Sequence, residues 1–308
     1  AVLTEDSTDF KSPTLTVQVK NAKGDEKAFK HSLYWGKVQS TALARKKLDE
    51  RHRILAGAAD VLDKKLGKPM GMKGVIRGLC VLSGPYLEIG ETLPIQLAVR
   101  PSRDLRLIWN NSAVDLDAKL SLMNALLFAQ RYIRRSVPGF NVDDYEYTVT
   151  MGSGGAIGGD SAGAALATLL ISYFTGIRIR SDVAITGTVD ANGRIGEVGG
   201  YADKSFAAFV DPYVTTLIIP RTPQAIYEST QIGLLVATHR VVAASSMEQV
   251  LRHALVTDNV SKWICEGQWM EALRLFKEKQ TSRAMTRLQS MHAEIPEDLT
   301  CSLWWNWL

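Results

Sequence analysis

The stretch that decides the fold is residues 160–210, DSAGAALATLLISYFTGIRIRSDVAITGTVDANGRIGEVGGYADKSFAAFV. The small residues after Ser161 predict a slim helix over 162–174 that packs closely against a neighbouring element. The apolar residues that lead to Thr186 predict a strand, and the apolar residues around Lys204 predict a second helix. Helix, strand and helix in this order indicate one continuous piece of α/β structure.

Ser161 and Lys204, which are 43 residues apart, are the candidate catalytic pair. A serine hydroxyl is a weak nucleophile until a neighbouring base takes its proton. A lysine can be that base only where burial keeps it neutral near the working pH. Two glycines precede Lys204 and apolar residues follow it, so its setting is mostly apolar. Because burial disfavours the charged form, we predict a buried Lys204 with a lowered pKa.

The stretch resembles the proteolytic domain of the Lon-type serine proteases. The family's pattern of nucleophile, small-residue helix, TG, R-x-DVA-x-TG, GR, GG and K-x-x-AA is met in order without a gap. Weaker similarity extends from about Lys73 to Val256. Asp160 departs from the pattern, because many members carry proline there, although the membrane-anchored branch has aspartate. The resemblance implies a Lon proteolytic-domain-like fold of the α/β (α+β) class, with Ser161 and Lys204 as a Ser-Lys dyad.

Residues beside the dyad have expected supporting roles. In the family pattern a threonine helps to hold the lysine, and the matching residue is Thr186. Asp160 and Asp203 each lie next to a member of the dyad. A carboxylate near Lys204 would raise the pKa of the amine, and would oppose catalysis unless it is turned away. Either Asp160 or Asp203 could therefore tune the lysine electrostatically.

The start of the helix after Ser161 is the expected oxyanion hole. A helix start leaves several backbone N–H groups without intrahelical partners and carries partial positive charge, which suits an oxyanion formed during acyl transfer. We expect the backbone N–H groups of Ser161 and Ala162 to stabilise it. The alternative is that Asp160 or Ser161 only caps the helix.

The loop before Ser161, residues 152–159, contains five glycines, which let a backbone come close to a ligand. We expect an extended substrate to add as a strand along this loop. The expected substrate-binding residues are Gly154, Gly155, Ala156, Ile157 and Gly158. No Lys-Ser or Lys-Thr follows the glycines, and no other P-loop pattern occurs in this sequence. We therefore expect no ATP-driven unfolding module in this polypeptide, and no cofactor.

The composition is that of an ordinary soluble protein, with 46% hydrophobic and 22% charged residues among 308. Cys80, Cys265 and Cys301 are widely spaced and odd in number. This pattern indicates neither a disulfide framework nor a metal site, and it favours a reducing compartment such as the cytoplasm. The sequence has no run of about 20 apolar residues and does not begin like a signal peptide. We expect no membrane partner. Because the chain begins without methionine, a processed or excised piece is one interpretation.

Residues 1–71 are expected to form a basic appendage. Residues 1–70 hold 14 Lys or Arg against nine Asp or Glu. The charges are interleaved and no aromatic stacking pattern accompanies them, so we expect a solvated surface and not a nucleic-acid site. Alternating apolar residues from Leu15 to Val19, a turn, and a second run to Leu33 predict a hairpin. Leucines at seven-residue spacing, at Leu48, Leu55 and Leu62, predict a long helix, either packed on the core or used in subunit assembly.

Residues 72–257 are the expected proteolytic domain, in which strands and helices alternate. We expect strands near 78–84, 92–99, 105–109 and 145–151, and an amphipathic helix over 115–135. Downstream, VTTLIIPRTPQ and MEQVLRHAL resemble the closing strand and helix of the Lon-type domain.

Residues 258–308 are the expected helical C-terminal appendage. Residues 259–290 resemble a helical hairpin whose apolar face includes Trp269 and Phe276. One such unit cannot bury its own face, so it must lie on the main domain or on a neighbouring subunit. Three tryptophans among the last five residues predict a docking patch where exposed, and a groove-filling segment where buried. A groove near Ser161 would imply self-inhibition or a product of self-cleavage.

The strongest rival hypothesis uses the same serine. Residues 159–163, GDSAG, fit the G-x-S-x-G nucleophile elbow of α/β-hydrolases, with Asp190 or Asp211 and His239 or His253 as triad partners. An elbow needs a strand that runs directly into the nucleophile, however, and here a glycine-rich loop intervenes.

The sequence thus predicts a serine endopeptidase that acts on unfolded or loosely structured polypeptides, without an ATPase of its own, and with self-processing as a further expectation. The resemblance also implies a homo-oligomer, a hexameric ring, that works alone, with a separate unfoldase or on a dedicated protein partner. A hypothesis from another class is a Lon-type domain kept as a non-catalytic scaffold or binding protein.

Overall fold

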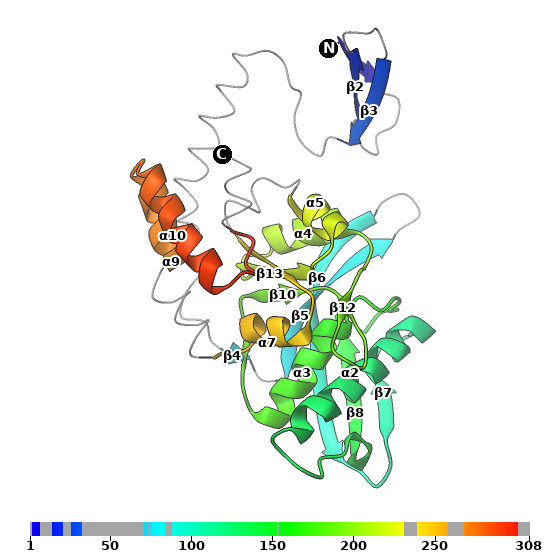
Figure 1. The fold of residues 1–308 in the computed structure, drawn as a ribbon. Helices are drawn as coiled ribbons and strands as arrows, with labels where there is room; N and C mark the ends of the chain where they lie inside the picture. Colours follow the sequence, from blue (N-terminus) through cyan, green and yellow to red (C-terminus); the bar gives the residue numbers. More distant parts are fainter. Residues whose placement is uncertain are drawn as a thin grey trace. The chain divides into compact units, whose positions relative to one another are not determined.

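The computed structural model describes residues 2–6, 14–20, 26–32, 71–72, 74–83, 88–152, 154–230, 239–257 and 268–300. The chain divides into two compact units. The first contains residues 1–50 and 84–87, and the second contains residues 51–83 and 88–308. Figure 1 labels their helices and strands.

The first unit is described as a three-stranded antiparallel sheet in the order β1-β2-β3. Its strands are β1 (Val2–Asp6), β2 (Thr14–Lys20) and β3 (Glu26–Ser32). The predicted hairpin is confirmed as β2 and β3, which pair from Thr14 with Ser32 to Lys20 with Glu26. Strand β1 was not predicted. The expected long helix lies outside the described residues.

The second unit is built on a seven-stranded mixed sheet in the order β14-β13-β10-β5-β6-β8-β7. Strands β14, β13, β10 and β5 run parallel to one another, whereas β6 is antiparallel to β5 and to β8. Two short two-stranded ladders, β4 with β9 and β11 with β12, lie outside this sheet. The strands of the second unit are β4 (Gly71–Met72), β5 (Val75–Ser83), β6 (Glu88–Pro101), β7 (Arg106–Trp109), β8 (Tyr145–Met151), β9 (Ile179–Arg180), β10 (Val183–Ile185), β11 (Thr188–Val189), β12 (Ile195–Gly196), β13 (Thr216–Pro220) and β14 (Arg240–Ala244).

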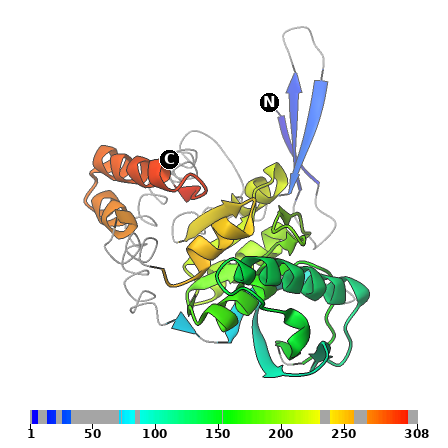
Figure 2. The ribbon, with the colours of Figure 1, turned by 60° about the horizontal axis from the view of Figure 1, so that its bottom comes forward.

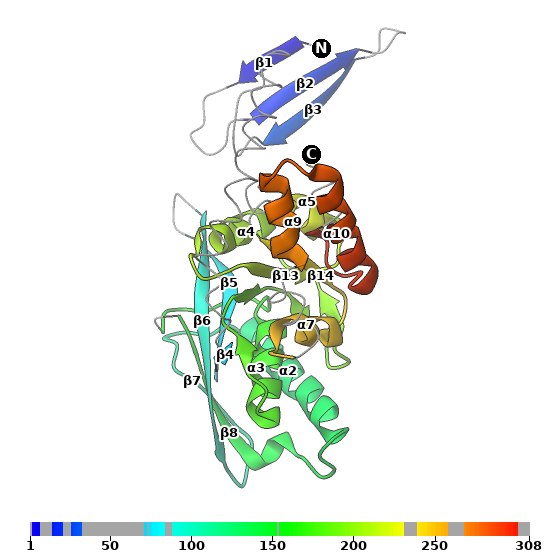
Figure 3. The same ribbon diagram turned by 90° about the vertical axis from the view of Figure 1, so that its left-hand side faces the viewer.

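Helices cover both faces of this sheet. On one face lie α2 (Leu116–Arg134), α3 (Gly163–Thr175) and α7 (Met247–Ala254), which Figure 3 shows together on one side of β5, β6 and β8. The other face carries α4 (Tyr201–Val210), α5 (Pro223–Thr230), α9 (Gln268–Lys277) and α10 (Thr281–Glu294). A short 3-10 helix, Val142–Asp144, precedes β8. The fold is therefore the expected mixed α/β arrangement, with one helical layer on each side.

The strand sequences explain why both faces are covered. In β13, Ile218 packs with α2, α3 and α7, whereas its neighbours Leu217 and Ile219 pack with the opposite layer. Every residue of β13 and β14 is buried. Because side chains alternate across a strand, a continuous apolar run is stable only when both faces are covered, as in parallel sheets.

The helices and strands of the proteolytic domain agree with the sequence to within a few residues. The helix expected over 115–135 is α2, whose N-cap is Asp115, and the helix expected over 162–174 is α3. Strand β5 begins before its predicted range and ends within it, and β6 extends beyond its predicted range at both ends, because the two form one long antiparallel ladder from Val75 with Gln96 to Ser83 with Glu88. Cross-strand pairing of this kind leaves little local signal in either strand.

The helical hairpin near the C-terminus is also present and packs on the sheet. Figure 2 shows α9 and α10 side by side. Trp269, 1% exposed, and Phe276 join a cluster that contains Val241 and Ala243 of β14. The apolar face of the hairpin is therefore buried against the second unit's own sheet. Trp263 and the tryptophan-rich end lie outside the described residues.

The segment after α10 extends the sheet at its β14 edge. The Ala243 amide donates to the carbonyl of Glu297, and the Leu299 amide donates to the carbonyl of Val241. Between these bonds, the buried carboxylate of Asp298 accepts from Nε of Arg240 at 2.9 Å. Burial would raise the pKa of Asp298, but the Arg240 charge and the bond from Thr300 hold it below its usual range. The segment directly after α10 is thus attached through a buried ion pair.

We predict that Asp298→Asn destabilises the protein by about 3–5 kcal/mol, because removing one partner leaves a buried guanidinium without its counter-charge. Urea unfolding followed by tryptophan fluorescence measures the change. Glu294→Gln, on the exposed face of α10, is the control and should change stability by less than about 0.5 kcal/mol. Equal effects of the two substitutions would contradict the structural role of the ion pair.

Candidate active site

Ser161 lies in a turn that leads into α3, and we call residues 160–162 the nucleophile turn. Helix α3 begins at Gly163, with Ala162 at the N-cap position and no side-chain capping bond. The Gly163 amide instead donates to the carbonyl of Asp160. The alternative that Asp160 or Ser161 only caps the helix is therefore wrong. The Ser161 side chain is not used in capping and is half-buried.

Two hydrogen bonds at Gly187 join the nucleophile turn to the end of β10. The Gly187 amide donates to the Ser161 carbonyl at 3.0 Å, and the Gly187 carbonyl accepts from the Ala164 amide at 3.0 Å. The Thr186 amide donates to Ile218 of the neighbouring strand β13. Strand β10 therefore holds Ser161 through backbone groups alone, in a position set by the sheet.

The backbone at the nucleophile turn has donors to offer. Among the described residues, the amides of Ser161 and Ala162 donate to no acceptor, whereas those of Gly163 and Ala164 are used. Two such amides next to a nucleophile are the arrangement that stabilises an oxyanion. This is the position at which the sequence predicted the oxyanion hole.

Lys204 is buried, as predicted. It lies on α4, which packs against β5 and β6, and its side chain is only 5% exposed. Burial lowers the pKa of Lys204 from 10.5 to about 8, against smaller opposing effects of Cys80 and Asp160, which raise it. The Asp160 effect places the amine within electrostatic reach of the nucleophile turn. At pH 8 about half of the lysine is neutral, so it can accept a proton.

Thr186, the expected supporting residue, has a buried hydroxyl. The residue is 1% exposed, and its Oγ1 makes no hydrogen bond within the described part of the chain. Buried hydroxyls are nearly always paired, so an unpaired one next to a candidate site suggests a partner that is acquired during function. Its position directly before Gly187 fixes it beside the nucleophile turn.

A small cavity of about 100 Å³ opens beside Ser161. Residues 78–82 of β5, Leu93 and Ile95 of β6, Met151, residues 156–159, Ser161 and Ala162 line it. Three of the expected substrate-binding residues, Ala156, Ile157 and Gly158, are among these, whereas Gly154 and Gly155 are not. The cavity therefore joins the nucleophile to β5, which the sequence did not link to the site.

The glycine-rich loop is fixed by side chains that sequence reasoning missed. The Asn111 amide group donates to the carbonyls of Met151 and Gly155, each at 2.9 Å, and its oxygen accepts from the Met151 amide. Asp115 accepts from the amides of Ala118 and Gly159, bonds that lower the pKa of its carboxyl. An aspartate before a helix is a recognisable cap, but nothing in the sequence indicates that it also binds a loop 44 residues away.

This fixation limits how a peptide can bind along the loop. The amide and carbonyl of Ile157 are already paired with Ala113 and Asp115, and the carbonyls of Gly154 and Gly155 are occupied as well. Only part of the loop backbone therefore remains to bind an extended peptide.

Cys80 is a further residue that was missed as a site residue. It lines the cavity, and burial raises the pKa of its thiol to about 11.

The residues of the rival triad are engaged in other contacts. His253 is buried with its Nε2 against Glu297 at 3.4 Å, and His239 is buried and packs against Phe209. Asp211 accepts from Thr92, and Asp190 accepts from backbone amides of its own turn. No strand runs directly into Ser161, since β8 ends at Met151. The nucleophile-elbow geometry is therefore not present.

Two other features are absent from the described residues. Within them, no group of three or more His, Cys, Asp or Glu side chains is placed to hold a metal ion. No described helix is both long and apolar enough to cross a membrane.

Residues 122–257 match the model of the Lon protease (S16) C-terminal proteolytic domain. This part of the chain is a Lon-type proteolytic domain. The matched residues include the nucleophile turn, Thr186 and Lys204, and they end at the close of α7.

Individual Lon relatives support the same assignment. Lon protease of Azorhizobium caulinodans is 30% identical over 191 residues, 59% of this chain and 21% of that protein. Lon protease 1 of Bacillus subtilis is 28% identical over 194 residues, 59% of this chain and 23% of that protein. Lon protease of Brucella abortus is 26% identical over 237 residues, 70% of this chain and 27% of that protein. The chain therefore spans about a quarter of the length of these relatives.

The Lon-type domain positions Lys204 through a close approach of two backbones. A Cβ atom added at Gly90 of β6 would lie 1.9 Å from the Asp203 carbonyl oxygen of α4, and 3.1 Å from the Lys204 amide. Only glycine permits this spacing. Strand β6 therefore fixes how closely α4 packs against the sheet. This distance in turn fixes how deeply Lys204 is buried.

We predict that Gly90→Ala destabilises the protein by about 1–3 kcal/mol, because the added methyl group meets backbone that cannot rotate away. Chemical denaturation measures the change. Gly155→Ala is the matched control, since a Cβ at that position meets no atom within 4 Å. A Gly90→Ala protein as stable as the Gly155→Ala protein would contradict the close approach.

We predict that Lys204 titrates with a pKa near 8, and that Asp160→Asn lowers this value, because the Asp160 carboxylate favours the charged amine. The measurement is a pH titration of the lysine side-chain resonance by NMR in protein labelled at the lysine ε-carbon, with Lys204→Arg to assign the signal. An ordinary pKa near 10.5 in the folded protein, unchanged by Asp160→Asn, would contradict the buried setting.

Proposed function

We propose that the chain is a serine endopeptidase in which Ser161 is the nucleophile and Lys204 is the general base. The observation that carries the proposal is a buried lysine with a pKa near 8, in electrostatic contact with the nucleophile turn of a Lon-type domain. A surface lysine would be charged at neutral pH and would have no proton-accepting lone pair to offer. Perturbed pKa values of this kind are concentrated at functional sites.

In the proposed reaction, the neutral amine of Lys204 takes the Ser161 hydroxyl proton as Oγ attacks the carbonyl carbon of a peptide bond. The amides of Ser161 and Ala162 stabilise the negative oxygen that forms. The C–N bond then breaks, the ammonium of Lys204 returns its proton to the leaving amine, and the acyl group stays on Ser161. A water molecule, deprotonated by Lys204, hydrolyses this ester and restores both side chains.

Thr186 is proposed to orient Lys204 during these steps. The buried hydroxyl lacks a partner among the described residues, and an amine that changes protonation state needs a group able both to donate and to accept. A hydroxyl meets that need. Asp160 is proposed to tune the lysine, since its charge raises the Lys204 pKa.

The substrate is proposed to bind as an added strand. Strand β5 pairs with β10 only at Arg77 and Gly78, so the same edge from Leu79 to Ser83 has no strand partner within the described residues. Residues 78–82 line the cavity beside Ser161. Backbone hydrogen bonds to this edge give affinity with little sequence preference, which favours unfolded or loosely structured polypeptides.

Several broader features remain proposals from the resemblance and the sequence. We propose that cleavage does not require ATP, and that the chain works as a homo-oligomeric, hexameric ring, alone, with a separate unfoldase or on a dedicated protein partner. The division into appendages at residues 1–71 and 258–308, self-processing and the cytoplasmic location remain predictions as well.

We predict that the wild-type protein cleaves unfolded casein without nucleotide and that Ser161→Ala and Lys204→Met each lower the rate by about 1,000-fold or more, as for other nucleophile and base removals. Peptides are identified by mass spectrometry, with and without ATP. Lys279→Met, an exposed lysine on the turn between α9 and α10, is the control and should retain full activity.

The same experiment separates the rival hypotheses. His253→Gln should retain Ser161-dependent cleavage, whereas a triad would lose it. Equal fragments from wild type and Ser161→Ala would remove the enzyme hypothesis and leave the scaffold. Cleavage that appears only with ATP would contradict the nucleotide-independent form of the proposal.

A further inference from the structure

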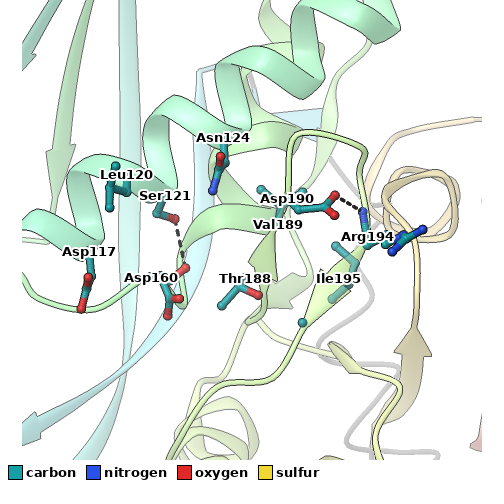
Figure 4. Close-up of a pocket in the computed structure, with 11 residues that line it drawn as sticks. Asp117, Leu120, Ser121, Asn124, Asp160, Thr188, Val189, Asp190, Arg194 and Ile195 are labelled. Carbon is teal, nitrogen blue, oxygen red and sulfur yellow. Dashed lines mark hydrogen bonds between the residues drawn. The ribbon is translucent and has the colours of Figure 1, made fainter.

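A second and larger cavity, of about 370 Å³, lies on the other side of the nucleophile turn. Figure 4 shows the residues that line it, which come from α2, from Asp160 and from the β11–β12 hairpin. Gly159, Ser161 and Ala162 line the first cavity, whereas Asp160 between them lines the second. The nucleophile turn thus borders two cavities, and Ser161 lies beside both.

The wall between the turn and the second cavity is held in place. The Ser121 hydroxyl of α2 donates to the Asp160 carbonyl at 3.0 Å, which Figure 4 marks. Gly163 packs so closely that a Cβ there would lie 2.9 Å from the Ser121 oxygen and from the Val189 amide. Helix α2, the turn and the β11–β12 hairpin are therefore packed without room to collapse into the cavity.

The lining of the second cavity combines apolar walls with an acidic end. Leu120, Val189 and Ile195 supply apolar surface. In Figure 4, Asp117 and Asp160 lie at one end, and Arg194 lies at the other, beyond Asp190. One oxygen of Asp190 already accepts from the backbone amides of Asn192 and Arg194. The charged groups facing the cavity are thus three carboxylates and one guanidinium, and the acidic pair at one end has no cation beside it in this lining.

This combination matches one class of side chain. Arginine and lysine carry a long apolar stem and a cationic head, so they bury the stem against apolar surface and keep the head among charged or polar groups. A purely acidic depression would favour small hydrated cations, and a purely apolar one would favour leucine or phenylalanine. A cavity with both features, on the nucleophile turn itself, suits the basic side chain of a polypeptide.

We propose that the second cavity is a specificity subsite that receives an arginine or lysine side chain of the substrate, on the side of the cleaved bond opposite to the residues held by β5. This inference rests on the proposed function, because the subsite belongs to the same Ser161. Asp117 and Asp160 receive the cationic head, and Leu120, Val189 and Ile195 contact the stem. The enzyme thus combines a strand-binding edge of low selectivity with one selective position.

The test begins with the cleavage sites themselves. Peptides released from unfolded casein by the wild-type protein are mapped by mass spectrometry, and residues within three positions of each cut are counted. We expect arginine and lysine to be enriched on one side only. The most frequent site is then synthesised as a quenched fluorescent peptide with arginine or with citrulline, which has nearly the same shape but no charge.

We expect kcat/KM of the wild-type protein to be about tenfold higher for the arginine peptide than for the citrulline peptide. Asp117→Asn should bring this ratio close to one, and Asp117→Arg should reverse it. Asp104→Asn is the matched control, because Asp104 is exposed in a loop outside this lining and loses the same charge. Thermal unfolding checks that each variant is folded.

The outcomes distinguish the two proposals. Ser161-dependent cleavage without enrichment of basic residues, or an Asp117→Asn effect equal for both peptides, overturns the subsite and leaves the protease. Absence of any Ser161-dependent cleavage overturns both. A ratio lost equally in Asp117→Asn and Asp104→Asn indicates general attraction of cations by surface charge and overturns the subsite.

Discussion

The constraint on which the site depends is the pair of backbone hydrogen bonds at Gly187. Through them the segment directly after β10 binds the nucleophile turn on one side and the first turn of α3 on the other. Strand β10 lies between β13 and β5 in the centre of the sheet, where covering layers on both faces make the backbone rigid. Ser161 therefore has the positional precision of the sheet, although it lies in a turn. A catalytic group needs this support, because small displacements of reacting atoms cost large factors in rate.

Much of this arrangement could be predicted from the sequence, because local chemistry and tertiary structure agree there. The small residues after Ser161 permit the close packing of α3, and the continuous apolar runs of β13 and β14 match strands covered on both faces. The burial of Lys204 followed from its apolar neighbours.

The parts that were missed involve residues distant in sequence. Asn111 and Asp115 hold a loop some 40 residues away, and Cys80 reaches the site only because β5 passes beside it. No periodicity or motif marks such contacts.

The glycine-rich loop illustrates that composition does not reveal which backbone groups the chain itself already uses. Its composition indicated a backbone open to a substrate strand, and part of it does line the cavity beside Ser161. Its other groups are already paired with residues 111–115, since glycine lets the chain's own backbone approach as readily as a ligand's. The unpaired edge is instead that of β5, and it exists because β10 is only three residues long. Where a peptide can add to β5 thus depends on the length of β10. The sequence of β5 alone does not give that length.

Asp160 links the two proposals electrostatically. Its charge raises the Lys204 pKa, which lowers the fraction of neutral base at neutral pH, and it also lines the second cavity. A cationic side chain bound there would offset the Asp160 charge, lower the Lys204 pKa and increase the fraction of lysine able to take the Ser161 proton. By thermodynamic reciprocity the same cation binds more tightly when Lys204 is neutral, because one like charge is then absent. Many Lon-type domains carry proline at the position of Asp160. Proline has no carboxylate, so this coupling is absent from them. Under the two proposals, an aspartate at this position would make the base less active until a basic substrate is bound, so that selectivity and activation would arise from the same carboxylate.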